Sequence, residues 1–141
     1  MTALTIMTNN NIALDTNVLI YIHDSSSSIK KTIAEDLLAD NPFISSQVIS
    51  EYLNTTRRLL QLSKDELLAQ TSNLLADCTI IPVLSSTLLS AAELVKKYHF
   101  QLFDAVIVSA AKENNCAILY SEDMQHGLVV DKSLTIINPF L

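Results

Sequence analysis

Short runs of apolar residues alternate along this chain with longer segments in which apolar residues recur every three or four positions. The short runs are typical of buried strands, and the longer segments are typical of amphipathic helices. We predict strands at residues 12–14, 43–44, 79–81, 117–120 and 134–137. Helices are predicted at residues 18–22, 29–39, 46–60, 63–75, 86–98 and 102–113. This alternation indicates an α/β fold with a short, mainly parallel central sheet flanked by helices.

Polar residues at the boundaries of these segments are expected to cap the helices. Asp15 or Thr16 is placed to cap the first helix, and Ser45 or Ser46 the third. Short polar side chains favour these positions because they accept hydrogen bonds from the free N–H groups of the first turn. The run Ser63-Lys64-Asp65-Glu66 fits a capping box.

The length and composition predict one compact domain. Hydrophobic residues make up 49% of the 141 residues and charged residues 17%, which favours a folded chain with a single core. We expect residues 1–11 to form a flexible leader before the first strand. No apolar run approaches the roughly 20 residues of a membrane span, and a secretory signal is not recognisable. Cys78 and Cys116 match no zinc spacing and no disulfide framework, which favours reduced thiols in the cytoplasm.

The formal net charge of −6 limits the classes of function. A protein that coats nucleic acid is normally basic, so broad phosphate binding is disfavoured. The chain has one glycine, Gly127, which excludes a glycine-rich loop for a dinucleotide or a nucleoside triphosphate. A small site that acts on one phosphodiester remains compatible with this charge, because a metal ion offsets the carboxylates around it.

Four acidic residues stand where a negative charge needs an explanation. Asp104 lies in the apolar segment 102–111, which we expect in the core, where an unpaired carboxylate is costly. Asp15 and Asp123 follow predicted strands, and Glu51 lies on a predicted helix. Ligands bind beyond the carboxyl ends of parallel strands, and helix N-termini face the same rim, so the four side chains can meet. Carboxylates without cationic partners suit Mg²⁺ or Mn²⁺, which can activate water for phosphodiester hydrolysis.

Four short motifs, in a fixed order, carry a resemblance to a known family. They are ALDTNVLI at residues 13–20, SSQVISEYLN at 45–54, LFDAVIVSAA at 102–111 and AILYSEDMQHG at 117–127. This pattern resembles a PIN domain, most closely the small bacterial ribonuclease toxins of the VapC type, over about residues 12–137. The resemblance implies a three-layer PIN-like fold and a metal-dependent endoribonuclease. It also implies a homodimer that is held inactive by a cognate antitoxin.

The resemblance also implies roles for individual residues. The family's acidic metal ligands, which are its catalytic residues, match Asp15, Glu51, Asp104 and Asp123. Asn17 and Ser121 match positions that support these ligands through hydrogen bonds, and we assign Thr16 to the same supporting set. Apart from the resemblance, Arg57 and Arg58, on the helix that carries the glutamate, are the best candidates among the basic residues for contacts with the RNA backbone, although such pairs usually form a solubilising helix face. The expected cofactor is Mg²⁺ or Mn²⁺.

Simpler interpretations exist for several of these residues. Asp15 also fits a helix cap, and Glu51 also fits an ordinary surface acid paired with Arg58. Glu122 competes with Asp123 for the place of the fourth ligand, although Asp123 matches the family position.

Other classes of function are weighed against the nuclease. A phosphotransferase with Asp15 as nucleophile is disfavoured, because Asn17 stands where its general acid is needed. The absence of one of the four acids would favour a non-catalytic binding module. All four acids are present, which favours an active enzyme. A housekeeping RNA-processing nuclease of the same fold would carry the same ligands and stays open. His126 could reach a scissile phosphate, although a loop histidine is more often a surface residue.

The sequence also leads to expectations about partners. The helices at 29–39 and 46–75 carry more apolar positions than one sheet face covers, so we expect exposed apolar patches for a homodimer and an antitoxin. Aromatic residues make up 6% of the chain, so the stacking platform of a general single-strand binder is missing. We therefore predict cleavage of one or a few structured RNAs, such as a tRNA or a ribosomal stem-loop.

Overall fold

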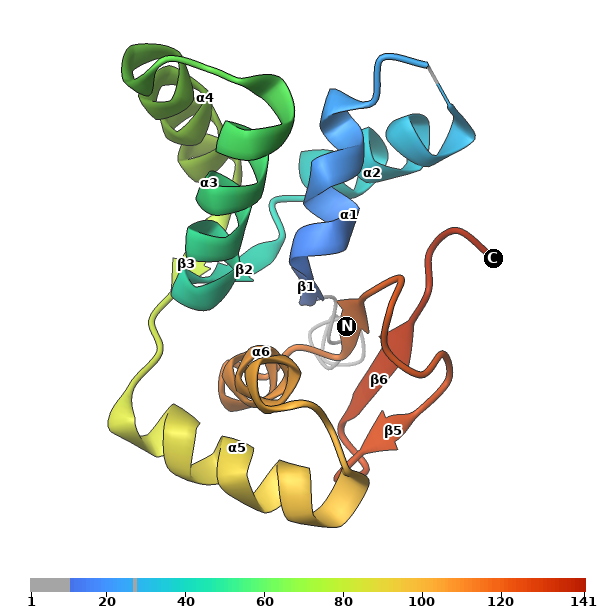
Figure 1. The fold of residues 1–141 in the computed structure, drawn as a ribbon. Helices are drawn as coiled ribbons and strands as arrows, with labels where there is room; N and C mark the ends of the chain where they lie inside the picture. Colours follow the sequence, from blue (N-terminus) through green and yellow to red (C-terminus); the bar gives the residue numbers. More distant parts are fainter. Residues whose placement is uncertain (1–10, 27) are drawn as a thin grey trace, which may run out of the picture.

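In residues 11–26 and 28–141, which the computed structural model describes, six strands form a sheet at the centre of the molecule (Figure 1). The strands are β1 (Ile12–Leu14), β2 (Phe43–Ser45), β3 (Thr79–Ile81), β4 (Ile118–Tyr120), β5 (Val129–Val130) and β6 (Leu134–Ile137). Their order across the sheet is β3-β2-β1-β4-β6-β5, and of these six β5 alone is antiparallel to its neighbour. The predicted α/β fold with a mainly parallel sheet is confirmed.

Helices cover both faces of this sheet. They are α1 (Thr16–Ile20), the 3₁₀ turn η2 (Tyr21–His23), α2 (Ile29–Ala39), α3 (Ser46–Leu60), α4 (Lys64–Asp77), α5 (Ser85–Tyr98) and α6 (Leu102–Glu113). The crossovers from β1 to β2 and from β2 to β3 run in one direction across the sheet, and that from β3 to β4 runs back. Because such crossovers are right-handed, α1 to α4 lie on one face, and α5 and α6 on the other (Figure 1). None of the helices in the described part of the chain is long and apolar enough to cross a membrane.

Side-chain caps fix where the helices begin. The carboxylate of Asp15 accepts the N–H of Thr16 and caps α1, so Asp15 is the cap of this pair. Ser45, rather than Ser46, caps α3. The capping box predicted at Ser63 is present at the start of α4. The Asp15 cap places this carboxylate at the junction between the first strand and the first helix.

Helix α6 packs into the core along most of its length. All seven of its residues from 105 to 111 are buried. Ser109 lies inside this run, and its hydroxyl donates a 2.8 Å hydrogen bond to the carbonyl of Thr87 on α5, which satisfies the buried polar group. Leu102 and Phe103, however, are 63% and 62% exposed. The expectation that the whole apolar segment is buried is therefore wrong, because the packing of α6 begins only at Ala105.

Two parts of the chain differ from the prediction or fall outside it. Strand β5 was not predicted, because two residues give no alternating pattern. The turn that follows uses Asp131 and Lys132 at positive φ angles of 47° and 59°, in place of the Asn-Gly pair that marks such hairpins. Of the predicted leader, residues 1–10 lie outside the described residues. Asn11 accepts a 2.9 Å hydrogen bond from the N–H of Ala117.

Candidate functional site

The strand order creates a crevice between β1 and β4. These strands are neighbours, but the chain leaves β1 towards β2 on one side, and β4 pairs on its other side with β6. In open α/β sheets, ligands bind outside the carboxyl ends of the strands at such a switch point. Asp15 directly follows β1, and Ser121 directly follows β4. The first predicted carboxylate thus lies in the place where this topology favours a ligand.

Asp15 is the most buried of the predicted acidic residues, with 5% of its surface exposed. Its carboxylate accepts hydrogen bonds from the Thr16 N–H (2.7 Å) and the Ser121 hydroxyl (2.8 Å). Burial raises the pKa of Asp15 to about 6, against the lowering effect of these two hydrogen bonds, and repulsion from Asp104 and Glu51 adds to the rise. Desolvation therefore outweighs the hydrogen bonds, and the ionised form of Asp15 is held at a cost.

Asn17 joins the two sides of the crevice. Its amide nitrogen lies 3.2 Å from Asp15 Oδ2 and 3.1 Å from Asp123 Oδ2, so one amide donates to both carboxylates. Its amide oxygen accepts the N–H of Glu122 at 3.0 Å. Ser121 completes the link, since its oxygen accepts the N–H of Met124 at 3.3 Å while its hydroxyl donates to Asp15. Asn17 and Ser121 thus hold the loop after β4 against the end of β1.

Glu51 reaches the same place from α3. Its two carboxylate oxygens accept hydrogen bonds from the Thr16 hydroxyl (2.7 Å) and from the side-chain amide of Gln47 (3.0 Å). These contacts replace the ion pair with Arg58 that a surface glutamate would form. Thr16 therefore ties α3 to the start of α1.

Asp104 approaches from the opposite layer, in the first turn of α6, and is half-buried. Burial raises its pKa, and repulsion from Glu51 and Asp123 adds to the effect. Asp104 and Glu51 in turn raise the pKa of Asp15. The four predicted acids therefore interact electrostatically as one group, although they come from four different parts of the chain.

The four acids line a single cavity of about 530 Å³. The cavity is lined by Asp15, Glu51, Asp104, Asp123, Glu122, Thr16, Asn17, Ile20, Tyr21, Asn54 and Thr55. None of these lining residues is a lysine, an arginine or a histidine. Among the described residues, Glu122 pairs with Lys30 and the other four carboxylates of the lining have no ion-pair partner, so the cavity has a negative potential.

The chemistry of these donors fits a hard divalent cation, because carboxylate oxygens are the ligands that Mg²⁺ and Mn²⁺ prefer. In the described part of the chain, however, no three His, Cys, Asp or Glu side chains stand close enough together to hold an ion. Both oxygens of Glu51 and both oxygens of Asp15 already accept hydrogen bonds, which hold these carboxylates apart. Several carboxylates can share an ion only after some of these side chains move closer together.

Other predicted residues lie outside this cavity. Arg57 and Arg58 are exposed on α3, and the Arg57 guanidinium is 3.4 Å from the side-chain oxygen of Asn54, which does line the cavity. His126 accepts the N–H of Asn138 at its Nδ1 (2.9 Å), so it has a structural role in its turn.

The sequence prediction missed several residues of the site. Tyr21, Asn54 and Thr55 line the cavity, and Gln47 bonds Glu51. All four stand one helical turn from a residue that was predicted. Tyr21 follows Asn17 by four positions, Asn54 and Thr55 follow Glu51 by three and four, and Gln47 precedes Glu51 by four. The helical repeat of three to four residues was the available signal.

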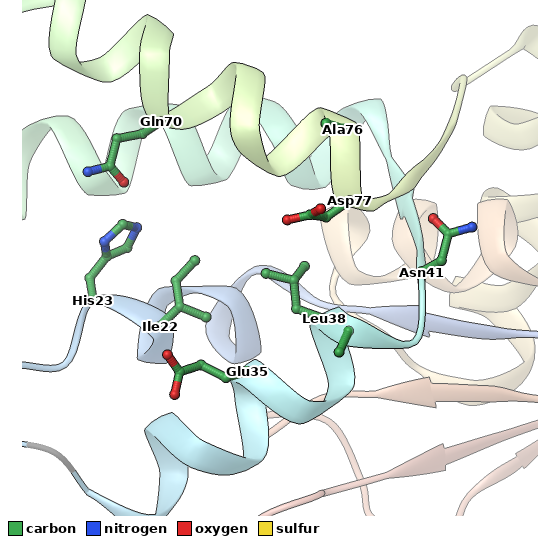
Figure 2. A pocket seen from close by; sticks show the side chains of 9 residues that line it. Ile22, His23, Glu35, Leu38, Asn41, Gln70, Ala76 and Asp77 are labelled. Atoms are coloured by element: carbon green, nitrogen blue, oxygen red, sulfur yellow. The ribbon is translucent and has the colours of Figure 1, made fainter.

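A second and larger cavity, of about 800 Å³, lies between α2 and α4 (Figure 2). Figure 2 shows Glu35 and Leu38 of α2 on one side, and Gln70 and Asp77 of α4 on the other, with His23 at one end. The two cavities share no lining residue. The larger one therefore has no part in the cluster of four acids.

Comparison with known proteins agrees with the fold and the motifs. The PIN domain family matches residues 12–129, and this chain belongs to that family. No curated protein matches the chain in sequence. Because the family match covers most of the chain, the predicted PIN-like fold is confirmed.

Solved structures with a similar fold come from toxin–antitoxin systems. A toxin–antitoxin complex from Klebsiella pneumoniae has a TM-score of 0.68 at 19% identity, over 92% of this chain and 98% of that chain. VapC20 of Mycobacterium tuberculosis, a toxin that cleaves the sarcin–ricin loop, has a TM-score of 0.63 at 17% identity, over 80% and 90%. VapBC2 from Rickettsia felis, bound to a DNA fragment from its promoter, has a TM-score of 0.65 at 20% identity, over 89% and 96%. At these identities the likeness establishes the fold.

Proposed function

We propose that this protein is a metal-dependent endoribonuclease and the toxin of a toxin–antitoxin pair. The observation that carries the proposal is the cavity at the end of β1 and β4, where Asp15, Glu51, Asp104 and Asp123 gather without a cation in the lining. Burial, with a smaller contribution from repulsion by the neighbouring acids, raises the pKa of both Asp15 and Asp104, so their ionised forms are costly to hold. A bound cation would remove this cost, which is the physical reason for placing one here.

Asp15, Glu51, Asp104 and Asp123 would hold Mg²⁺ or Mn²⁺. Such an ion supplies an activated water and neutralises charge at the phosphate. Neighbouring polar side chains of the protein orient these carboxylates. Asn17 keeps Asp15 and Asp123 at a fixed separation through its two hydrogen bonds, and Thr16 fixes one oxygen of Glu51. Ser121 anchors Asp15 from the far side of the crevice. Substitution of residues that orient metal ligands in this way commonly lowers metal affinity or activity by about 10–100-fold.

The substrate we propose is a structured RNA loop, such as one in a tRNA or a ribosomal RNA. A cavity with four unpaired acids repels a polyanion except where a cation neutralises it, so affinity must come from the ion and a few basic residues. Arg57, which contacts Asn54 of the cavity lining, and the exposed Arg58 beside it on α3 are the contacts we propose for the RNA backbone. The similar toxin from M. tuberculosis cleaves the sarcin–ricin loop, which supports this class of substrate.

The partners we propose are a second copy of the chain and a cognate antitoxin, in the cytoplasm. Large apolar side chains are exposed on the helices where the sequence predicted them: Ile29 is 79% exposed, Leu59 64% and Leu68 62%. Exposed apolar surface of this kind marks protein–protein contacts. The similar structures from K. pneumoniae and R. felis are toxin–antitoxin assemblies, which supports an antitoxin partner.

A cleavage assay with the purified protein tests the proposal. End-labelled tRNA and ribosomal RNA are incubated with Mg²⁺ or with chelator, and the fragments are resolved on gels. Cleavage is expected with Mg²⁺, and Asp104→Asn is expected to lower it by about 100-fold or more. Asp36→Asn, which changes an exposed acid on α2, is the matched control. Full activity in chelator contradicts the proposal, and RNA binding without cleavage favours the non-catalytic module. If the purified protein cleaves RNA but its induced expression does not slow the growth of cells, the housekeeping nuclease is favoured.

A further inference from the structure

A fifth acid, Glu122, lines the same cavity but is held by a separate cluster. Tyr21 of η2 donates its hydroxyl to Glu122 Oε1 at 2.7 Å. Lys30 of α2 places its ammonium 2.5 Å from Glu122 Oε2 and 3.2 Å from the Tyr21 hydroxyl. The Lys30 ammonium also lies 4.9 Å and 5.3 Å from the ring centres of Tyr21 and Phe140. Both oxygens of Glu122 are thus engaged by residues of another layer of the fold.

This arrangement separates two adjacent carboxylates. Asp123 faces Asn17 and is part of the group of four acids, while Glu122, one residue earlier, is turned towards Lys30. The backbone at this point is fixed, because the Glu122 N–H donates to the Asn17 side-chain oxygen. The Lys30 ammonium forms an ion pair with Glu122 Oε2 at 2.5 Å, and the Tyr21 hydroxyl donates to the other oxygen. Glu122 is therefore a stable carboxylate whose charge is neutralised locally.

We propose that Lys30 and Tyr21 are positioning residues that keep Glu122 away from the metal-binding acids, so that Asp123 alone is available from this turn. The inference rests on the proposed function. Glu122 is longer than Asp123 and lines the same cavity, so without its partners it is free to rotate towards a bound cation. An extra carboxylate would strengthen the hold on the ion and occupy a position that water or the substrate phosphate needs. The contacts that Lys30 and Tyr21 make with Glu122 thus leave that position open.

Two other roles for Lys30 predict different results. If its ammonium binds an RNA phosphate, loss of Lys30 raises the KM for RNA and leaves turnover at saturating RNA unchanged. If the cluster only stabilises the fold, its loss lowers the melting temperature and weakens metal binding. The proposed role predicts tighter metal binding together with slower turnover, and this combination distinguishes it from both.

The test measures Mn²⁺ binding by titration calorimetry without RNA, and turnover on the RNA found in the cleavage assay. Lys30→Met keeps an apolar stem against Tyr21 and Phe140 but removes the charge. We expect Lys30→Met to bind Mn²⁺ about threefold more tightly, because a released carboxylate near the ion adds Coulomb attraction. Turnover is expected to fall about tenfold, as for other residues that orient metal ligands. Tyr21→Phe should change both values in the same directions, to a smaller extent.

A second substitution in the same chain supplies the decisive comparison. Lys30→Met combined with Glu122→Gln removes the released carboxylate, so Mn²⁺ affinity should return to the wild-type value and turnover to within about threefold of it. Lys96→Met, which removes an exposed ion pair with Glu93 on α5, should change neither value. Unchanged Mn²⁺ affinity, or weaker binding that the double variant does not restore, overturns the inference while the proposed nuclease stands. A wild-type protein that binds no Mn²⁺ and cleaves no RNA contradicts the proposed function itself.

Discussion

Removing the charge of Asp15 should stabilise the metal-free protein, and Asp15→Asn is the change that isolates this effect. Asparagine caps helices about as well as aspartate, so α1 keeps its cap. A pKa of about 6 in the folded protein, in place of the usual value near 4, corresponds to about 3 kcal/mol of lost stability when the group is ionised. The asparagine oxygen keeps the cap bond from Thr16, whereas Ser121 and Asn17 lose the oxygen to which they donate, which costs about 1 kcal/mol each. The net expectation is a gain of about 1 kcal/mol.

The pH dependence of this gain follows from the direction of the pKa shift. Because the folded protein binds the Asp15 proton more tightly than the unfolded chain does, the wild-type loses stability from this group as the pH rises from about 4 to about 6. The advantage of Asp15→Asn should therefore be full at pH 7–8 and disappear near pH 4. Unfolding in urea with chelator present, at several pH values, measures it.

Bound metal should make the wild-type protein more stable than Asp15→Asn. Mg²⁺ at about 100 times its dissociation constant would stabilise the wild-type by about 2.7 kcal/mol, whereas the variant should gain little. A variant that is less stable than the wild-type at pH 8 in chelator refutes the reasoning. That result would make Asp15 a structural cap whose hydrogen bonds outweigh its desolvation.

Three further predictions concern the other acids and the assembly. Asp131→Asn is a control in which the pKa shift has the opposite direction. Lys112 and Lys97 hold the pKa of Asp131 below its usual range, so the ionised carboxylate stabilises the folded protein by about 1 kcal/mol. This stabilisation should be present above about pH 4 and lost on acidification. A loss of stability that is independent of pH down to pH 2 would contradict this. Asp104→Asn should abolish Mn²⁺ binding and leave metal-free stability equal or higher, because burial and its neighbours raise the pKa of Asp104; a marked loss of stability would instead make Asp104 structural. Light scattering at micromolar concentration should give the mass of a dimer, and a single-chain mass counts against the proposed homodimer.

The parts of the fold that local patterns determine were predictable from the sequence. The strands before Asp15 and Asp123 are short apolar runs that end at polar residues, and parallel strands bring their carboxyl ends to one edge. The capping box at Ser63 depends on residues three positions apart, so it is also local. These features depend on periodicity and hydrogen-bonding chemistry within a few residues, which the sequence displays directly.

The features that were not predicted depend on contacts between distant segments. The direction of the Glu122 side chain is determined by Tyr21 and Lys30, about 100 positions away in the sequence. Phe103 is exposed because the packing of α6 begins only at Ala105, which the apolar composition of the segment does not indicate. Arg57 carries a charge suited to RNA, but its distance from the acids follows from the orientation of α3. Sequence patterns identify the residue types of the site, and tertiary packing decides which of them reach the cavity.

The central claim is that the acids of this cavity cut RNA at defined places. Mapping RNA 5′ ends across total cellular RNA after induced expression tests this claim most directly, with an Asp15→Ala, Asp104→Ala double variant as the matched control. We predict new ends at one or a few structured loops, in a tRNA or a ribosomal RNA, and none with the double variant. Scattered cuts without a preferred site, or cuts that persist in the double variant, would contradict the claim.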